Sequence, residues 1–115
     1  MSYVDGFIVP VPNDKRDDYL ALARRAALRF KELGALEIVE CWGDDVPKGT
    51  LTSFPLAVKC TDQETVVFSW IRWPSRDMRD AAHKIMMDDP EFSAATMPFD
   101  GKRLIFGGFN VLLQA

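Results

Sequence analysis

Hydrophobic and polar residues recur with two different spacings along this chain, one typical of strands and one typical of helices. Runs of β-branched and aromatic residues, bounded by proline, glycine or polar turns, predict strands. These strands cover residues 3–11, 35–42, 65–73 and about 103–113. Apolar residues at helical spacing predict one helix over about residues 14–33 and another between the N-cap Ser75 and a stop at residues 88–92. The apolar run over residues 56–60 is a further, short edge strand in this prediction.

Polar residues at the ends of the first predicted helix support its bounds. Asn13 precedes it and can accept hydrogen bonds from the first free amides. Acidic residues lie in its early turns and basic residues in its later turns, an order that suits the helix dipole. Gly34 stands where a helix needs a residue that adopts positive φ. We therefore expect this helix to lie between Asn13 and Gly34.

The predicted order of elements is β-α-β-β-α-β, which is the arrangement of the ferredoxin-like fold. This is an α+β fold in which an antiparallel sheet carries both helices on one face. A sheet covered on one face should alternate apolar and polar residues. The third strand does not, because Val66, Phe68 and Trp70 lie on one face while Val67 and Ile71 lie on the other. We therefore expect a second copy of the chain to cover the open face, giving a homodimeric α/β barrel.

Length, charge and cysteine content predict the number of domains and argue against several kinds of partner. A chain of 115 residues predicts one domain over residues 1–115. A net charge of −3 without a lysine and arginine cluster argues against nucleic acid or an anionic membrane as partner. The chain has no apolar run of membrane-spanning length, and its first residues lack the basic start of a signal peptide. Cys41 and Cys60 stand far apart, which is typical of reduced thiols in a cytoplasmic protein.

The titratable residues offer few metal or cofactor ligands. His83 is the single histidine, so a multi-histidine metal site is excluded and haem would have to use this residue. Its plain interpretation is a solvated residue on the flank of the second helix, and its functional interpretation is a general base at a pocket rim. Asp44 and Asp45 lie near Glu40 but lack a calcium-loop pattern, which favours a solvated turn. We expect neither a metal nor a cofactor.

Three tryptophans and one arginine are candidate ligand contacts. Trp42, Trp70 and Trp73 could line an aromatic pocket, although they equally suit a core or a dimer interface. Arg72 shares a strand face with Phe68 and Trp70, so it needs an anionic partner. That partner is either a carboxylate across the dimer or the carboxylate of a substrate.

The turn before the last strand, MPFDGKR at residues 97–103, has two interpretations. Backbone amides near Asp100 and Gly101, with Lys102 and Arg103, could hold an anion. The alternative is a turn chosen for its backbone geometry, with both cations at a strand start. Gly107-Gly108 lies inside a strand and has no following helix, which excludes a nucleotide-binding loop. The glycine pair instead indicates a bend in the strand or a close approach by another group.

Four segments of the chain resemble one family in its order and spacing. They are YVDGFIVPVP at the start, DDVP in the middle, VVFSWI followed by PSR, and MPFDGKRLIFGGF near the end. Together they resemble the YbaA-like family of small bacterial proteins of unknown function, within the dimeric α/β-barrel superfamily. The resemblance implies a ferredoxin-like protomer whose sheet packs on its partner's sheet. The superfamily includes cofactor-independent monooxygenases, haem-degrading enzymes, isomerases, decarboxylases and ligand-sensing domains, so the resemblance does not decide the activity.

The leading hypothesis is therefore a small-molecule-binding homodimer with its pocket between sheet and helices. The expected ligand contacts are Trp42, Trp70, Arg72 and Arg103. The weaker catalytic candidates are His83, Asp100 and Arg103. The alternatives are a cofactor-independent monooxygenase-like or isomerase-like enzyme and a purely structural or regulatory dimeric module.

Overall fold

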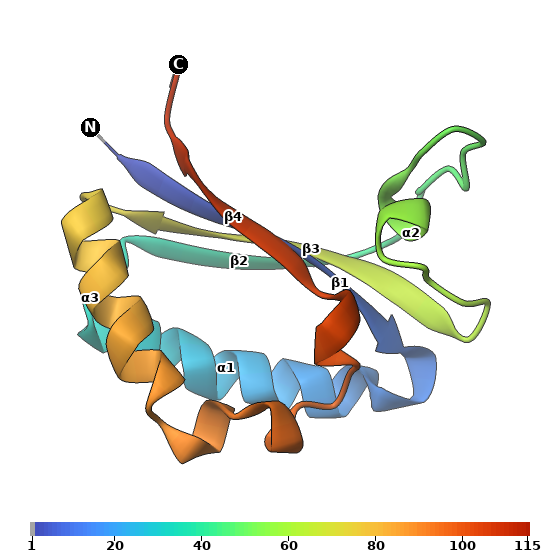
Figure 1. Cartoon of the computed structure of the whole chain (residues 1–115), viewed down its shortest axis with the longest axis horizontal. Helices are drawn as coiled ribbons and strands as arrows, with labels where there is room; N and C mark the ends of the chain where they lie inside the picture. The colour runs from blue at the N-terminus through green and yellow to red at the C-terminus, as the bar shows by residue number, and fades with distance from the viewer. Residues whose placement is uncertain (1) are drawn as a thin grey trace.

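The computed structural model describes residues 2–115 and has one four-stranded antiparallel sheet (Figure 1). Its strands are β1 (Tyr3–Pro12), β2 (Glu37–Trp42), β3 (Glu64–Trp73) and β4 (Ile105–Asn110), in the spatial order β2-β3-β1-β4. The helices are α1 (Arg16–Glu32), α2 (Phe54–Ala57) and α3 (Arg76–Met87). Short 3-10 turns are η1 (Asn13–Lys15), η2 (Pro90–Phe92), η3 (Ala94–Thr96) and η4 (Gly101–Arg103). Helices α1 and α3 lie on the same face of the sheet, so the predicted ferredoxin-like fold is confirmed.

The predicted edge strand over residues 56–60 is wrong, because this segment begins as the short helix α2. Ser53 caps the helix by accepting a hydrogen bond of 3.0 Å from the amide of Leu56, and a proline occupies the first turn. Lys59 then has a φ of 51°, which an extended strand does not allow. Local capping chemistry therefore overrides the apolar character of the segment.

The last strand is shorter at both ends than predicted. Residues Gly101–Arg103 form the turn η4, so β4 begins only at Ile105. At its other end β4 stops at Asn110, which lies opposite Tyr3, the first residue of β1. The strand ends because its partner strand ends there.

The predicted caps have mixed outcomes. Asn13 lies in η1 and its side chain accepts a hydrogen bond from the Thr65 hydroxyl, so the expected N-cap role is wrong. The cap at Ser75 is confirmed, since its hydroxyl accepts a hydrogen bond of 3.3 Å from the amide of Met78. Gly34 follows α1 with a φ of 108°, as a C-cap glycine should.

The core lies between the sheet and the two long helices. Residues at alternate positions of β1 and β3 point toward the helices, and they form two buried clusters. One cluster surrounds Trp73, which is fully buried beside Phe30 of α1, and the other contains Val9, Val11 and Val67. Burial of these apolar surfaces is the main force that fixes the helices on this face.

The opposite face of the sheet is apolar and largely open. Phe68 and Ile105 are 42% and 44% exposed there, and Phe109 is 61% exposed. Helix α2 reaches only one end of this face, where Phe54 packs on Phe68 with ring centroids 5.8 Å apart. The strands are therefore apolar on both faces, as the sequence indicated: one face packs against the helices and the other is exposed. Within residues 2–115 no helix is long and apolar enough to cross a bilayer.

Candidate functional site

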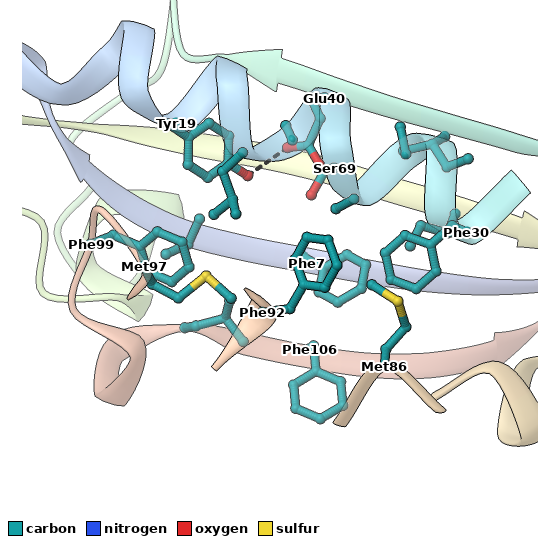
Figure 2. Close-up of a pocket in the computed structure, with 18 of the residues that line it drawn as sticks. Phe7, Tyr19, Phe30, Glu40, Ser69, Met86, Phe92, Met97, Phe99 and Phe106 are labelled. Carbon is teal, nitrogen blue, oxygen red and sulfur yellow. Dashed lines mark hydrogen bonds between the residues drawn. The ribbon is translucent and has the colours of Figure 1, made fainter. Parts of the chain in front are cut away.

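A cavity of about 420 Å³ lies between α1 and the sheet (Figure 2). Apolar side chains from β1, β3, β4, α1 and α3 line most of it. The segment between α3 and β4 closes one end with Met97 and Phe99, while Phe30 and Met86 lie at the other end. Phe7 projects from β1 between these two ends.

The sequence of α1 explains why space remains under this helix. Its face toward the sheet carries Ala23, Ala26 and Ala27 at helical spacing. Their methyl groups do not reach the sheet as a leucine or phenylalanine would, so the helix stands over a void there. Larger residues at Tyr19 and Phe30 keep the two ends of the helix packed.

One polar cluster in the cavity wall consists of Tyr19, Glu40 and Ser69. The Tyr19 hydroxyl donates a hydrogen bond of 2.5 Å to Glu40 Oε1, as Figure 2 shows. Burial among apolar atoms raises the pKa of Glu40, and hydrogen bonds from Tyr19 and Ser69 offset this only in part. The same burial, with the charge and hydrogen bond of Glu40, raises the pKa of Tyr19. Glu40 keeps accessible area because β2 is an edge strand, so this carboxyl faces both the cavity and its opening.

A second polar cluster is built around Asp5, a fully buried carboxylate on β1. Its Oδ2 lies 2.8 Å from His83 Nε2 and accepts a hydrogen bond of 2.9 Å from Trp73 Nε1. Its Oδ1 accepts a hydrogen bond of 2.9 Å from Arg79 Nε. Burial alone would raise the pKa of Asp5, but the hydrogen bonds from His83, Arg79 and Trp73 outweigh it and lower this pKa. Asp5 is therefore a fixed anion.

His83 joins this second cluster to the cavity. This residue lies on α3, its side chain is 24% exposed, and it is one of the residues that line the cavity. Gly108 of β4 lies opposite Asp5 and leaves room for neighbours, since a Cβ there would collide with the Tyr3 hydroxyl and lie 2.8 Å from Arg79 Nη2. The glycine pair of the last strand is thus explained at Gly108 by a close approach of side chains.

A family model described as "Protein of unknown function (DUF1428)" matches residues 2–101. The chain belongs to this family. It is 56% identical over 116 residues to the uncharacterized protein YbaA of Escherichia coli (strain K12), with 99% of each chain covered. The predicted YbaA-like relationship is therefore confirmed.

Two solved structures share the fold of this DUF1428 protein. One is SnoaB, a cofactor-independent oxygenase from Streptomyces nogalater, in a mutant form, with a TM-score of 0.62 and 14% identity. That match covers 97% of this chain and 95% of SnoaB. The other is Rv0793 from Mycobacterium tuberculosis, with a TM-score of 0.56, 15% identity, and coverage of 100% and 99%. At these identities the likeness concerns the fold alone.

The predicted ligand contacts on the strands do not line the cavity. Trp42 packs beside the second core cluster, with the Arg16 guanidinium 5.5 Å from its ring centroid. Trp70 and Arg72 lie on the open face of the sheet, at strand positions that alternate with the helix-facing ones. Trp70 Nε1 donates a hydrogen bond of 3.1 Å to Glu37 on that face. These three residues are therefore not placed to contact a ligand that lies between the sheet and the helices.

The polar groups of the turn before β4 point away from the cavity as well. Arg103 donates hydrogen bonds of 2.8 Å and 2.6 Å to the two carboxylate oxygens of Glu64 and one of 2.9 Å to the carbonyl of Lys59. Asp100 caps η4 and accepts a hydrogen bond of 3.1 Å from Arg103 Nε. These contacts agree with the structural interpretation of the turn, in which Arg103 fastens η4 to the start of β3.

Sequence reasoning missed the residue at the centre of the second cluster. Asp5 stands in a strand between apolar residues at alternate positions, Tyr3 and Phe7, on the face that packs against the helices. A carboxylate on a core-facing position is a signal, since buried charges need partners. The partner residues Arg79 and His83 are four apart on α3, so they share a helix face. Among residues 2–115, no group of three or more histidine, cysteine or carboxylate side chains is placed to hold a metal ion.

Proposed function

We propose that this DUF1428 protein binds a small, uncharged and mostly apolar molecule in the cavity between α1 and the sheet. The cavity of about 420 Å³ carries this proposal, because small-molecule sites fall in the range of roughly 300–1,000 Å³. Its walls are apolar and aromatic, and the few polar groups at Glu40, Ser69 and His83 would orient a ligand rather than solvate it.

The charge of the lining narrows the ligand class. Within the described residues, no lysine or arginine side chain lines the cavity, and its titratable groups are Tyr19, Glu40 and His83. A carboxylate or phosphate would have to leave water without a fixed cation to meet it, which costs several kcal/mol. A neutral molecule with one hydroxyl or carbonyl group suits these walls better.

Native mass spectrometry of freshly purified protein tests the proposal. The expected result is an added mass that remains under gentle conditions and is lost on denaturation. Ala26→Phe should abolish it, because the ring would fill the cavity from α1 without removing a polar group. Ala21→Phe, on the exposed face of the same helix, is the matched control and should retain the ligand. Equal retention by both variants would contradict this location of the site.

A second part of the proposal concerns assembly. We infer that the open face of the sheet pairs with the same face of a second copy. The supporting observation is the row of exposed apolar side chains at Phe68, Ile105 and Phe109, on strands that are apolar on both faces. Light scattering at micromolar concentration should give a dimer, and Phe109→Asp should give a folded monomer. A wild-type monomer would contradict this inference and leave the cavity proposal intact.

A cofactor-free enzyme is the second candidate function. The observation that favours it is the contact of His83, a residue of the cavity lining, with the fully buried carboxylate of Asp5, a pair that also occurs among catalytic bases. SnoaB, which shares the fold, is described as a cofactor-independent oxygenase. Turnover of a bound ligand without added cofactor would support this candidate, and recovery of the ligand unchanged would favour a pure binding module.

A further inference from the structure

We propose that His83 is the proton acceptor for a molecule held in the cavity, and that Asp5 and Arg79 are its positioning residues. The substrate class is a neutral molecule with an acidic C–H beside a carbonyl group, and the reaction class is enolisation. This inference rests on the proposed function, since it requires a ligand in the same cavity.

The contact with Asp5 decides which ring nitrogen of His83 is free. His83 Nε2 lies 2.8 Å from Asp5 Oδ2. An ionised carboxylate only accepts hydrogen bonds, so Nε2 must carry the hydrogen. In the neutral ring Nδ1 then keeps the lone pair, and a hydrogen bond from one nitrogen fixes the basicity of the other. His83 is one of the residues that line the cavity.

Arg79 and Trp73 also bind the Asp5 carboxylate that contacts His83. Arg79 Nε and Nη2 both lie 2.9 Å from Asp5 Oδ1, and its side chain is only 13% exposed. Trp73 Nε1 gives Oδ2 a further hydrogen bond of 2.9 Å. Arg79, which also contacts Asp80, and Trp73 therefore fix the Asp5 carboxylate, and this carboxylate in turn fixes the orientation of the His83 ring.

The proposed reaction is a proton transfer from carbon to His83 and back. His83 Nδ1 takes the proton from carbon, the C–H electron pair forms a C=C bond, and the carbonyl π pair moves to oxygen. Return of a proton from the ring to carbon restores the ketone, so the sequence balances without an oxidant or a reductant. The Ser69 hydroxyl belongs to the same lining and can rotate to donate a hydrogen bond to the oxygen, whereas the Glu40 carboxylate only accepts hydrogen bonds. A lining without cations again favours a neutral substrate over an acid.

Deuterium exchange into β-tetralone, a neutral bicyclic ketone, tests the inference. The experiment uses the full chain in D2O and follows loss of the NMR signal from the CH2 between the ring and the carbonyl group. We expect wild-type protein to accelerate exchange and His83→Gln to lose about 100-fold of the acceleration. The variant should still bind β-tetralone, as measured by saturation-transfer NMR. Lys84→Gln, the neighbouring exposed residue, is the control and should exchange at the wild-type rate.

A second measurement tests the positioning roles without any ligand. Because His83 is the single histidine, its ring gives one set of 15N signals. We expect the neutral form of the ring to carry hydrogen on Nε2 in the wild type, and to lose that uniform tautomer in Asp5→Asn, which a merely structural role would not require. A ring with hydrogen on Nδ1, or exchange as fast in His83→Gln as in the wild type, would overturn the inference. Failure of β-tetralone to bind the wild type would contradict the proposed ligand class instead, and the ring's tautomer would then decide the role of His83.

Discussion

Replacing Arg103 by Ala separates a structural turn from a ligand-binding turn. Arg103 makes a bidentate contact with the Glu64 carboxylate and also donates hydrogen bonds to Asp100 and to the carbonyl of Lys59. It does not line the cavity. We therefore expect Arg103→Ala to lower the free energy of unfolding and to leave retention of a cavity ligand unchanged.

The magnitude follows from the effect of Arg103 on Glu64. The Arg103 guanidinium, with smaller contributions from hydrogen bonds of Thr61, lowers the pKa of Glu64 from 4.5 to about 2. At about 1.4 kcal/mol per pKa unit this corresponds to at most ~3.4 kcal/mol of stability. The Glu64 side chain is 9% exposed and Arg103 is 24% exposed, so solvent near the surface screens part of this contact. We expect a loss of about 1–2 kcal/mol, or roughly 4–8 °C in Tm.

The pH dependence of this stability loss tests whether the loss comes from the pair of Arg103 with Glu64. The pKa of Glu64 is lower in the folded protein, so its contribution is fully present above 4.5, the unfolded value. It is lost as the pH falls from 4.5 toward about 2. Urea unfolding followed at several pH values should therefore show wild type and Arg103→Ala converging below pH 4.5. Lys102→Ala, in the same turn, should differ little from wild type at any pH.

Two results would refute this reasoning. A constant difference between wild type and Arg103→Ala across this pH range would mean that the pair with Glu64 is not its source. Loss of a retained ligand in a variant that stays folded would restore the anion-binding interpretation of the turn.

Two further predictions concern the polar clusters. Gly108→Ala should destabilise the fold by about 2 kcal/mol, because its Cβ would collide with Tyr3, whereas Gly101→Ala meets nothing within 4 Å and should be nearly neutral in urea unfolding. Glu40→Gln should raise Tm at pH 7 but not at pH 4, because the pKa of Glu40 is raised in the fold and its ionisation therefore costs stability above 4.5. Glu37→Gln, on the other face of β2, is the control for loss of charge, and an equal gain there would contradict the explanation from Glu40.

The fold was predictable because the spacing of hydrophobic residues and the residues at the ends of the elements indicated the same strands and helices along most of the chain. The runs that became β1 and β3 carry their β-branched and aromatic residues in strand order, and Gly34 and Ser75 bound the helices as expected. The prediction failed at residues 56–60, where apolar residues follow a capping serine and a proline. It also overextended the last strand, whose length depends on how far its partner β1 reaches. Pairing length is not encoded in one strand alone.

The candidate site was less predictable because it depends on which face each strand turns to the helices. Trp70 and Arg72 drew attention as an aromatic and a cation, yet register places them on the open face. Their neighbours Ser69 and Ile71 are the cavity-facing residues of the same strand. Asp5 was missed because its partners on α3 are distant in the sequence. Without knowing these partners, a single carboxylate in a strand does not indicate a buried cluster.

The Asp5 cluster couples the stability of the fold to the state of the candidate base. It joins β1, β3 and α3 through Trp73, Arg79 and His83, and it makes Gly108 of β4 necessary. Partners from β3 and α3 hold the Asp5 side chain in place for chemistry, but loss of Asp5 also leaves the largely buried Arg79 with only Asp80 as its anionic partner. Activity lost in Asp5 variants therefore cannot by itself separate positioning from folding. His83→Gln makes that separation, because it keeps Asp5 paired with Arg79 and Trp73 and removes only the ring that can take a proton.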